Sequence, residues 1–108
     1  ILFFKKSIYI LKMKLLNIQK SDRPKKKFMA TFEKDNGKKK ITYFGSAGMD
    51  DYTLTKDKEQ RERYRTRHKK DLTTGDPTRA GYLSYYLLWG DSTSLQENIK
   101  SYKKKFNL

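Results

Sequence analysis

The sequence is poor in the residues on which most catalytic and covalent chemistry depends. It has no cysteine, one histidine and 12 acidic residues, against 26 lysines and arginines. Without cysteine there are no disulfides and no thiolate metal sites, which fits a reducing compartment. His68 lies in the segment RTRHKK, where we expect a solvated side chain that no neighbour in sequence orients as a general base. We therefore expect no enzyme and no cofactor.

Long uninterrupted hydrophobic runs are also missing. The first sixteen residues are rich in apolar side chains but include Lys5, Lys6, Lys12 and Lys14. A membrane span needs about 20 mostly apolar residues, and a signal peptide needs an unbroken apolar region, so we expect neither a span nor secretion. Two interpretations of these sixteen residues stay open: translation starts at Met13, or the segment is an amphipathic or β-type arm that packs on a neighbour. Residues 1–24 are accordingly set apart as a leader or arm.

Hydrophobic residues make up only 35% of the chain, but 14% of its residues are aromatic. A chain of 108 residues fits one domain, and aromatic rings bury much apolar area each, so we expect a folded core within residues 25–108. Residues 17–27 are polar and are expected to form an exposed approach to this domain. The predicted fold class is α+β, with one β-hairpin followed by about three helices.

Alternation of apolar side chains predicts the hairpin. Phe28, Ala30 and Phe32 alternate with other residues, as do Ile41 and Tyr43, and residues 35–37 (DNG) favour a tight turn between the two strands. Residues 45–55 are expected to form a loop.

Three helices are predicted after this loop. The first covers residues 56–70, the second starts at Asp76 and Pro77 and ends at Gly90 in a left-handed residue, and the third begins with a capping box of Ser94 and Glu97. We expect the last two helices to pack on the hairpin through Leu83, Leu87, Trp89, Leu95, Ile99, Tyr102, Phe106, Phe28, Phe32 and Ile41.

The formal net charge of +14 points to a polyanionic partner. Helical spacing brings Lys58, Arg61, Arg65 and Lys69 close to one face of the helix 56–70, where such a row could meet successive phosphates. The alternative is a solvated helix with internal Glu–Arg pairs. Lysines beside the hairpin turn add charge, although lysine also protects strand edges from aggregation. The candidate binding residues are Lys58, Arg61, Arg65, Arg67, Lys69, Lys70, Lys38 and Lys39.

Aromatic side chains are interleaved with these cations, and such rings can stack on unpaired bases. Core packing is the better explanation for Tyr86, Trp89 and Tyr102, which leaves Tyr43, Tyr52 and Tyr85 as candidate stacking platforms. Asp50, Asp51 and Asp57 could in principle hold a divalent metal for nuclease chemistry, but turn and capping roles explain them first.

From about Lys27 onward, four segments carry a family resemblance: FGSAGMDDYT (44–53), RERYRTRHKK (61–70), GDPTRAGYLSYYLLWG (75–90) and YKKKF (102–106). In their order and spacing they resemble a family of small, uncharacterised basic proteins of large nucleocytoplasmic DNA viruses of algae and protists. The resemblance implies a viral origin and expression in an infected cell, and it carries no activity or catalytic residues to transfer.

Together these observations predict a non-enzymatic protein that binds DNA or RNA without sequence specificity, in the cytoplasm, nucleus or virion of an infected cell. The first alternative is a minor capsid or cement protein that pairs with acidic surfaces of other viral proteins. The second is a small metal-dependent nuclease, which no ligand spacing in the sequence supports.

Overall fold

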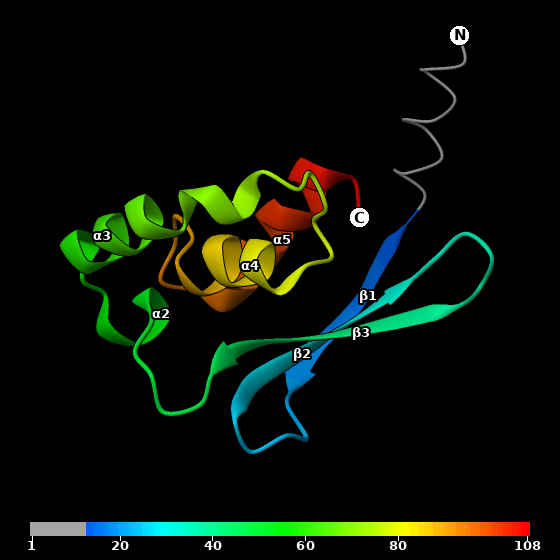
Figure 1. Cartoon of the computed structure of the whole chain (residues 1–108), viewed down its shortest axis with the longest axis horizontal. Helices are drawn as coiled ribbons and strands as arrows, with labels where there is room; N and C mark the ends of the chain where they lie inside the picture. Colours follow the sequence, from blue (N-terminus) through cyan, green and yellow to red (C-terminus); the bar gives the residue numbers. More distant parts are fainter. Residues whose placement is uncertain (1–12) are drawn as a thin grey trace, which may run out of the picture.

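The computed structural model describes residues 13–108, so the predictions for residues 1–12 lie outside the described part. Helices cover one face of a three-stranded antiparallel sheet with the order β1-β2-β3 (Figure 1), which confirms the α+β class. The strands are β1 (Lys14–Lys20), β2 (Lys26–Glu33) and β3 (Lys39–Ser46). The helical elements are α2 (Tyr52–Thr55), α3 (Lys58–His68), the 3₁₀ turn η1 (Lys69–Leu72), α4 (Ala80–Leu83), the π-helical turn η2 (Ser84–Leu88) and α5 (Leu95–Phe106).

The first strand, β1, was not predicted as part of the sheet. Residues 17–20 pair with β2 instead of forming an exposed approach, and β1 falls within the segment 1–24 that the sequence indicates as an arm. Leu15 lies opposite Phe32 and is buried, and Ile18 lies opposite Ala30. Leu15 and Ile18 are three positions apart in the sequence, and they face the same side of the sheet because the register shifts between Leu15 and Asn17. The bulge therefore hides the period-two pattern by which strands are recognised in a sequence.

The predicted hairpin of β2 and β3 is confirmed, but β3 presents the opposite set of side chains to the core. Ile41, expected in the core, is 51% exposed, whereas Phe44 is fully buried. The pairing explains this, because Phe44 lies opposite Phe28, and directly paired residues of antiparallel strands share a face. Because β3 has an apolar residue on each face, Ile41 on one and Phe44 on the other, the sequence alone does not show which face of the strand packs against the core.

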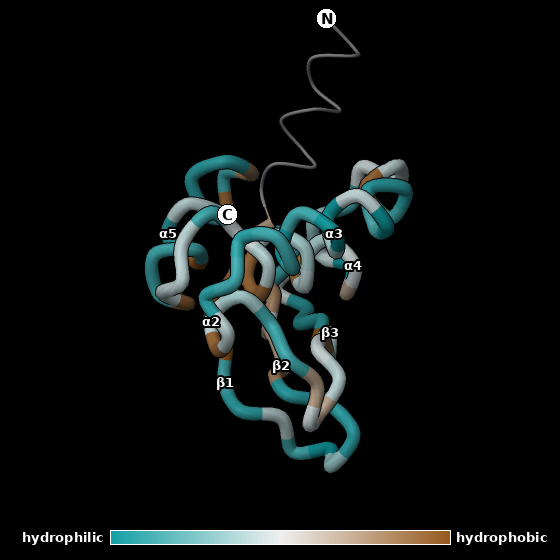
Figure 2. The backbone as a smooth tube through the Cα atoms, turned by 90° about the vertical axis from the view of Figure 1, so that its left-hand side faces the viewer, coloured by the Kyte–Doolittle hydropathy of each residue, from teal (hydrophilic) through white to brown (hydrophobic). Residues whose placement is uncertain are grey.

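The core lies between the sheet and the helices, where Figure 2 shows hydrophobic residues gathered. The prediction is confirmed for Phe32, Leu83, Leu87, Trp89 and Tyr102, which are buried. Phe28, Leu95, Ile99 and Phe106 pack against this core at its margin. The other buried hydrophobic residues are Leu15, Ala30, Phe44, Tyr52, Tyr82 and Leu88.

The segment before α4 is a turn and not the first turn of a helix. Asp76 accepts hydrogen bonds from the backbone N–H and the hydroxyl of Thr78, at 2.9 and 2.6 Å, and α4 begins only at Ala80. Burial alone would raise the pKa of Asp76, but the Thr78 hydrogen bonds and the nearby Lys40 and Arg79 hold it below its ordinary value. The buried Thr78 in turn binds Lys40 on β3, at 2.8 Å, so the turn ties the helices to the sheet.

Gly90 does not end its helix in a left-handed conformation as predicted, since its φ is not positive. Space explains the glycine instead: a Cβ at this position would first meet the carbonyl oxygen of Tyr86, and it would also lie 2.8 Å from the Cγ atom of Asn98. The buried Asn98 amide donates to the carbonyl groups of Leu87 and Ser92 at 2.9 and 2.8 Å. Its oxygen accepts from the Ser92 N–H at 3.0 Å. The first residues of α5 therefore hold the loop after η2, and the predicted Ser94 cap is confirmed by its contact with the Glu97 N–H.

A buried ion pair joins β2 to the segment predicted as a loop, which contains the one-turn helix α2. The ammonium group of Lys27 lies 2.6 Å from the carboxylate of Asp51, with the two side chains only 13% and 3% exposed. Asp51 also caps α2 by accepting from the Thr53 N–H at 2.9 Å. Removing one partner of a buried pair leaves the other charge uncompensated, which is more costly than removing both.

We predict that Lys27→Met lowers the free energy of unfolding by about 3 to 5 kcal/mol, because it leaves the Asp51 carboxylate buried without a counter-ion. Adding Asp51→Asn should recover part of this loss, since asparagine keeps the capping oxygen without the charge. Urea denaturation measures both variants. Lys25→Met, at an exposed neighbouring position, should change stability by no more than about 0.5 kcal/mol. A double variant less stable than Lys27→Met would contradict this role of the pair.

Candidate nucleic-acid interface

Helix α3 begins later than predicted and has no core face. Lys56 adopts a left-handed conformation (φ 58°) that separates α2 from α3, so the helix starts at Lys58. Asp57 caps it by accepting from the N–H groups of Glu59 and Gln60, at 3.0 and 3.1 Å. None of its residues is buried, and Figure 2 shows its hydrophilic character. An ordinary surface helix attaches through an apolar stripe, so α3 must be attached in another way.

One ring provides most of the attachment of α3. The ring of Tyr64 stacks on that of Trp89, with centroids 4.4 Å apart and planes 9° apart. On its other side Tyr64 stacks on His68, at 4.1 Å and 23°. Burial, and then the negative charge of Asp71, raise the pKa of Tyr64. The three rings form a continuous stack from the core to the end of α3.

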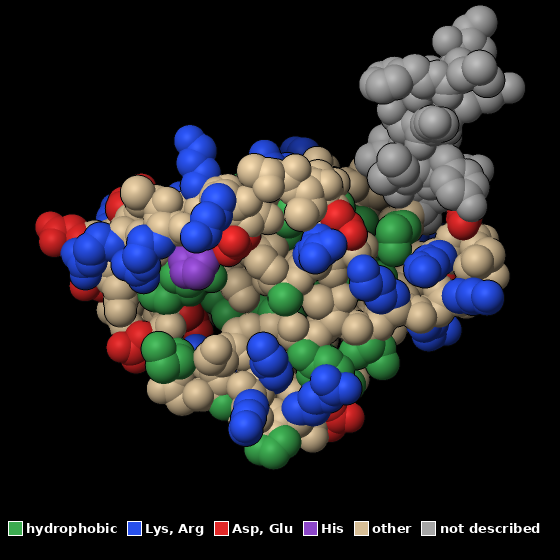
Figure 3. Space-filling view, in the orientation of Figure 1, with side chains coloured by type: hydrophobic (Ala, Val, Ile, Leu, Met, Phe, Trp, Pro, Cys, Tyr) green, Lys and Arg blue, Asp and Glu red, His purple; other side chains and the backbone are tan. Residues whose placement is uncertain are grey.

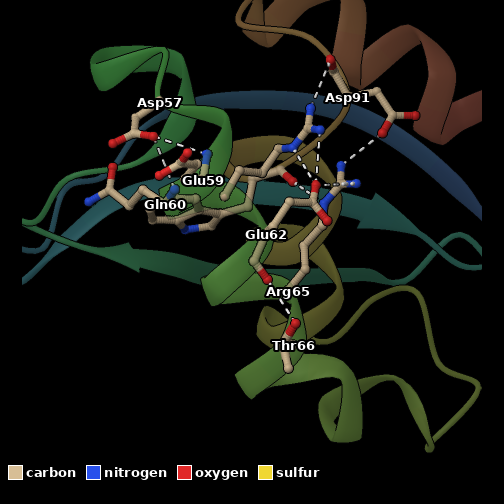
Figure 4. A network of polar contacts seen from close by, with 9 residues as sticks. Asp57, Glu59, Gln60, Glu62, Arg65, Thr66 and Asp91 are labelled. Carbon is tan, nitrogen blue, oxygen red and sulfur yellow. Dashed lines mark hydrogen bonds and ion pairs between the residues drawn. The ribbon is translucent and has the colours of Figure 1, made fainter.

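Two arginines of the predicted binding row also hold the helix in place (Figure 4). Arg65 donates from Nε to the carbonyl oxygen of Trp89 and from Nη2 to the carboxylate of Asp91, both at 2.8 Å. Arg61 lies over the buried ring of Tyr52, with its guanidinium carbon 4.7 Å from the ring centre. The side chain of Arg61 is only 15% exposed, and that of Arg65 is only 20% exposed. Their positive charges are engaged by contacts inside the fold.

The predicted row therefore divides into two groups. Arg61 and Arg65 face the domain, while Lys58, Arg67, Lys69 and Lys70 are exposed. Arg63 is exposed as well and was missing from the predicted set, although its spacing to Arg67 and Lys70 is that of one helix face. We call the exposed residues the outer row of α3: Lys58, Arg63 and Arg67 on the helix itself, with Lys69 and Lys70 in the turn η1 that directly follows it.

The predicted hairpin lysines do not join the outer row. Lys38 and Lys39 are exposed at the β2–β3 turn, and Lys39 lies 3.7 Å from Glu33. In Figure 1 this turn and α3 lie at opposite ends of the long axis of the molecule, whose extent is 44 Å. The structure therefore brings together the α3 part of the predicted set and leaves the hairpin part separate.

The predicted stacking platforms are mostly occupied. Tyr52 is buried beneath Arg61, and the Arg23 guanidinium lies 3.9 Å from the ring centre of Tyr43. Tyr85 packs edge-on against the neighbouring Tyr86. His68, which was expected to be a solvated side chain with no orienting neighbour, is instead held by Asp71, with its Nδ1 atom 2.9 Å from the carboxylate.

A groove of about 590 Å³ lies beside the stack, between α3, α4 and the end of β3. Figure 3 shows the hollow next to the histidine, with Lys and Arg side chains above and below it. Its walls include Lys26, Tyr64, Arg67, His68 and Gly81. The groove therefore connects the ring stack, through Tyr64 and His68, with the outer row, through Arg67.

Asp51, which the nuclease alternative needs, is already bound to Lys27 and to α2. Within residues 13–108, no cluster of three or more histidine and acidic side chains is arranged to hold a metal ion. In the same range, no helix combines the length and the apolar character needed to cross a bilayer.

The comparison with protein families finds a match over about half of the chain. Residues 16–68 are similar to the family described as "Family of unknown function (DUF5754)". The match takes in β2, β3, α2 and α3 with most of β1, and it ends at His68, the last residue of α3. No curated protein and no solved structure matches the chain.

The contact of Arg65 with Asp91 leads to a prediction about the pKa of Asp91. The hydrogen bond from Arg65 is the main reason why the pKa of Asp91 lies below its ordinary value. Arg65→Gln should raise this pKa towards about 3.9, the value of an unperturbed aspartate. An NMR titration of the Asp91 carboxyl carbon measures it, and Arg63→Gln, the same change on the exposed side of α3, should leave it nearly unmoved.

The same shift sets the sign of a pH effect on stability. The pKa of Asp91 is lower in the folded state than in the unfolded state. The contribution of the Asp91 carboxylate to the free energy of unfolding is therefore complete above the unfolded-state pKa, and it is lost as the pH falls through the folded-state pKa. The difference in free energy of unfolding between the wild type and Asp91→Asn should therefore shrink below about pH 4. A difference that grows on acidification would contradict the pairing.

Proposed function

We propose that this protein binds nucleic acid without sequence specificity through the outer row of α3. The observation that carries the proposal is the division of the helix into two charged sides. Arg61 and Arg65 are engaged by Glu62, Asp91 and the Trp89 carbonyl. In the described part of the chain, the outer row has no ion pair with a carboxylate, so its charges are available to a polyanion.

The spacing of the outer row suits a phosphate backbone. Arg63 and Arg67 are about one helical turn apart on α3, which is roughly 5.4 Å of rise, and Lys70 follows in the turn η1. Duplex DNA carries one negative charge per about 1.7 Å of axis, so successive side chains can meet separate phosphates. Arginine can grip a phosphate through two N–H groups at once. The row is thus suited to a regular line of anions more than to a single isolated one.

The lack of sequence specificity follows from the chemistry of the same side chains. Contacts to phosphates position a protein on nucleic acid but carry no sequence information. The outer row consists of long, exposed cations whose spacing suits phosphates, and the proposal assigns them to phosphate contacts and none of them to base edges. The family resemblance of residues 44–53, 61–70 and 75–90 extends the proposal to a viral protein that acts on a genome or in a virion within an infected cell.

The proposal predicts a specific change in salt dependence. Replacing Arg63, Arg67 and Lys70 by glutamine should weaken binding to duplex DNA about equally for all sequences, and should reduce the slope of log affinity against log salt by about 3. Fluorescence anisotropy with a labelled duplex between 50 and 200 mM salt measures the slope.

Lys100, Lys103 and Lys104 give a matched control. They are exposed on α5, and their replacement by glutamine removes the same total charge from a different helix. Equal losses in the two triple variants would mean that net charge alone drives binding, which contradicts an interface on α3. Binding to an acidic protein but not to DNA or RNA at the same low salt would favour the capsid or cement alternative.

A further inference from the structure

We propose that the groove beside α3 is a site for one unpaired nucleobase, which stacks on the open face of His68 while its own phosphates meet Arg67 and the outer row. This rests on the proposed function and deepens it, because it names single-stranded nucleic acid as the preferred form. The site is built from elements that sequence reasoning assigned to the core or to solvent.

The first argument is the geometry of the ring stack. Tyr64 is covered on both faces, by Trp89 at 4.4 Å and by His68 at 4.1 Å. His68 is the last ring of the series and is covered by Tyr64 on one face only. Its side chain is still 38% exposed although one face and the Nδ1 edge are occupied, so the exposed area must lie on the other face and the remaining edge. A flat aromatic ligand can extend the stack at that face.

The second argument is that the His68 ring is fixed before any ligand arrives. Its Nδ1 atom lies 2.9 Å from Asp71, which is in the turn η1 that follows α3. Asp71 packs closely on α4 at Gly81, where a Cβ atom would come within 3.0 Å of the Asp71 Cβ. Tyr64 and Asp71 therefore restrain the imidazole from two directions. A platform held in this way loses little conformational entropy when a base stacks on it.

The third argument concerns the size and charge of the groove. Its volume of about 590 Å³ is within the range of about 300 to 1,000 Å³ that ligand pockets occupy. Lys27 is neutralised by Asp51, and the other two cations of the wall, Lys26 and Arg67, are balanced in number by the carboxylates of Asp50 and Asp71. The lining therefore has little net charge, which suits an uncharged ring inside the groove. Arg67 belongs both to the wall and to the outer row, so it marks the place where a nucleotide's phosphate would follow its base.

These arguments predict a preference for unpaired strands. A base in a duplex has both faces covered by its neighbours, whereas a base in a single strand can leave the stack at little cost. Duplex DNA would contact the outer row alone. A single strand would gain the His68 contact in addition, and stacking on an aromatic side chain is worth about 1 to 3 kcal/mol per base.

The test compares three probes with equal numbers of phosphates at pH 8 and low salt: oligothymidine, an abasic strand of the same length, and a duplex. In the wild type, oligothymidine should bind more tightly than the abasic strand. His68→Ala should lower the affinity for oligothymidine by roughly 5- to 150-fold, which is the value of one stacked base. It should leave the abasic strand and the duplex within about twofold of the wild type.

His68→Phe is the matched variant, because phenylalanine keeps an aromatic face and loses only the contact with Asp71. This variant should retain most of the affinity for oligothymidine. The fluorescence of the single tryptophan reports whether each variant keeps the stack of Tyr64 on Trp89. If His68→Ala weakens all three probes equally, or if oligothymidine and the abasic strand bind alike, the base site is wrong while nucleic-acid binding stands. If no probe binds at low salt, the proposed function itself fails.

Discussion

The ring of Tyr64, stacked between Trp89 and His68, fixes the position of α3, and the arrangement of charge on the molecule depends on that position. A helix without a buried residue cannot be held by the hydrophobic effect alone. Here one aromatic ring supplies the packing, and Arg65 adds two hydrogen bonds to the loop after η2. That loop is itself held by Asn98 of α5. The attachment of α3 thus extends, contact by contact, to the last helix.

Because α3 is attached in this way, some of its cations make contacts inside the fold and the others are exposed to solvent. Arg61 and Arg65 satisfy the Trp89 carbonyl and the carboxylates of Glu62 and Asp91, so they contribute to the fold. The outer row keeps its charges exposed. A surface of like charges destabilises the compact state by self-repulsion, and a bound polyanion would relieve that cost. The net charge of +14 is therefore a poor guide to the site; what matters is which cations the fold leaves without a partner.

Much of the fold was predictable because it depends on local signals. The alternation of Phe28, Ala30 and Phe32 and the capping box at Ser94 predicted β2 and α5 correctly. The errors arose where a distant contact decides. The bulge in β1 concealed a strand, and the pairing of Phe44 with Phe28 set the phase of β3. The position of Gly90 is typical of a helix terminator, but a glycine is needed there because a Cβ would meet the carbonyl oxygen of Tyr86 and the side chain of Asn98, eight residues further along the chain.

The candidate site was predictable only in part for the same reason. Composition located the basic helix, and Lys58, Arg67, Lys69 and Lys70 are exposed on it. Nothing local distinguishes Arg65 from Arg67, because the difference lies in Asp91 and Trp89, more than twenty residues away. His68 was likewise interpreted as solvated, since the stack behind it requires Trp89 to be close to Tyr64.

The most direct test of the division of α3 is an NMR titration that follows the arginine Nε–H signals while a short single-stranded oligonucleotide is added at low salt. The signals of Arg63 and Arg67 should shift, whereas those of Arg61 and Arg65 should stay in place because Nε of Arg65 remains on the Trp89 carbonyl and Arg61 remains over Tyr52. Shifts of Arg61 and Arg65 that equal or exceed those of Arg63 and Arg67 would contradict the account.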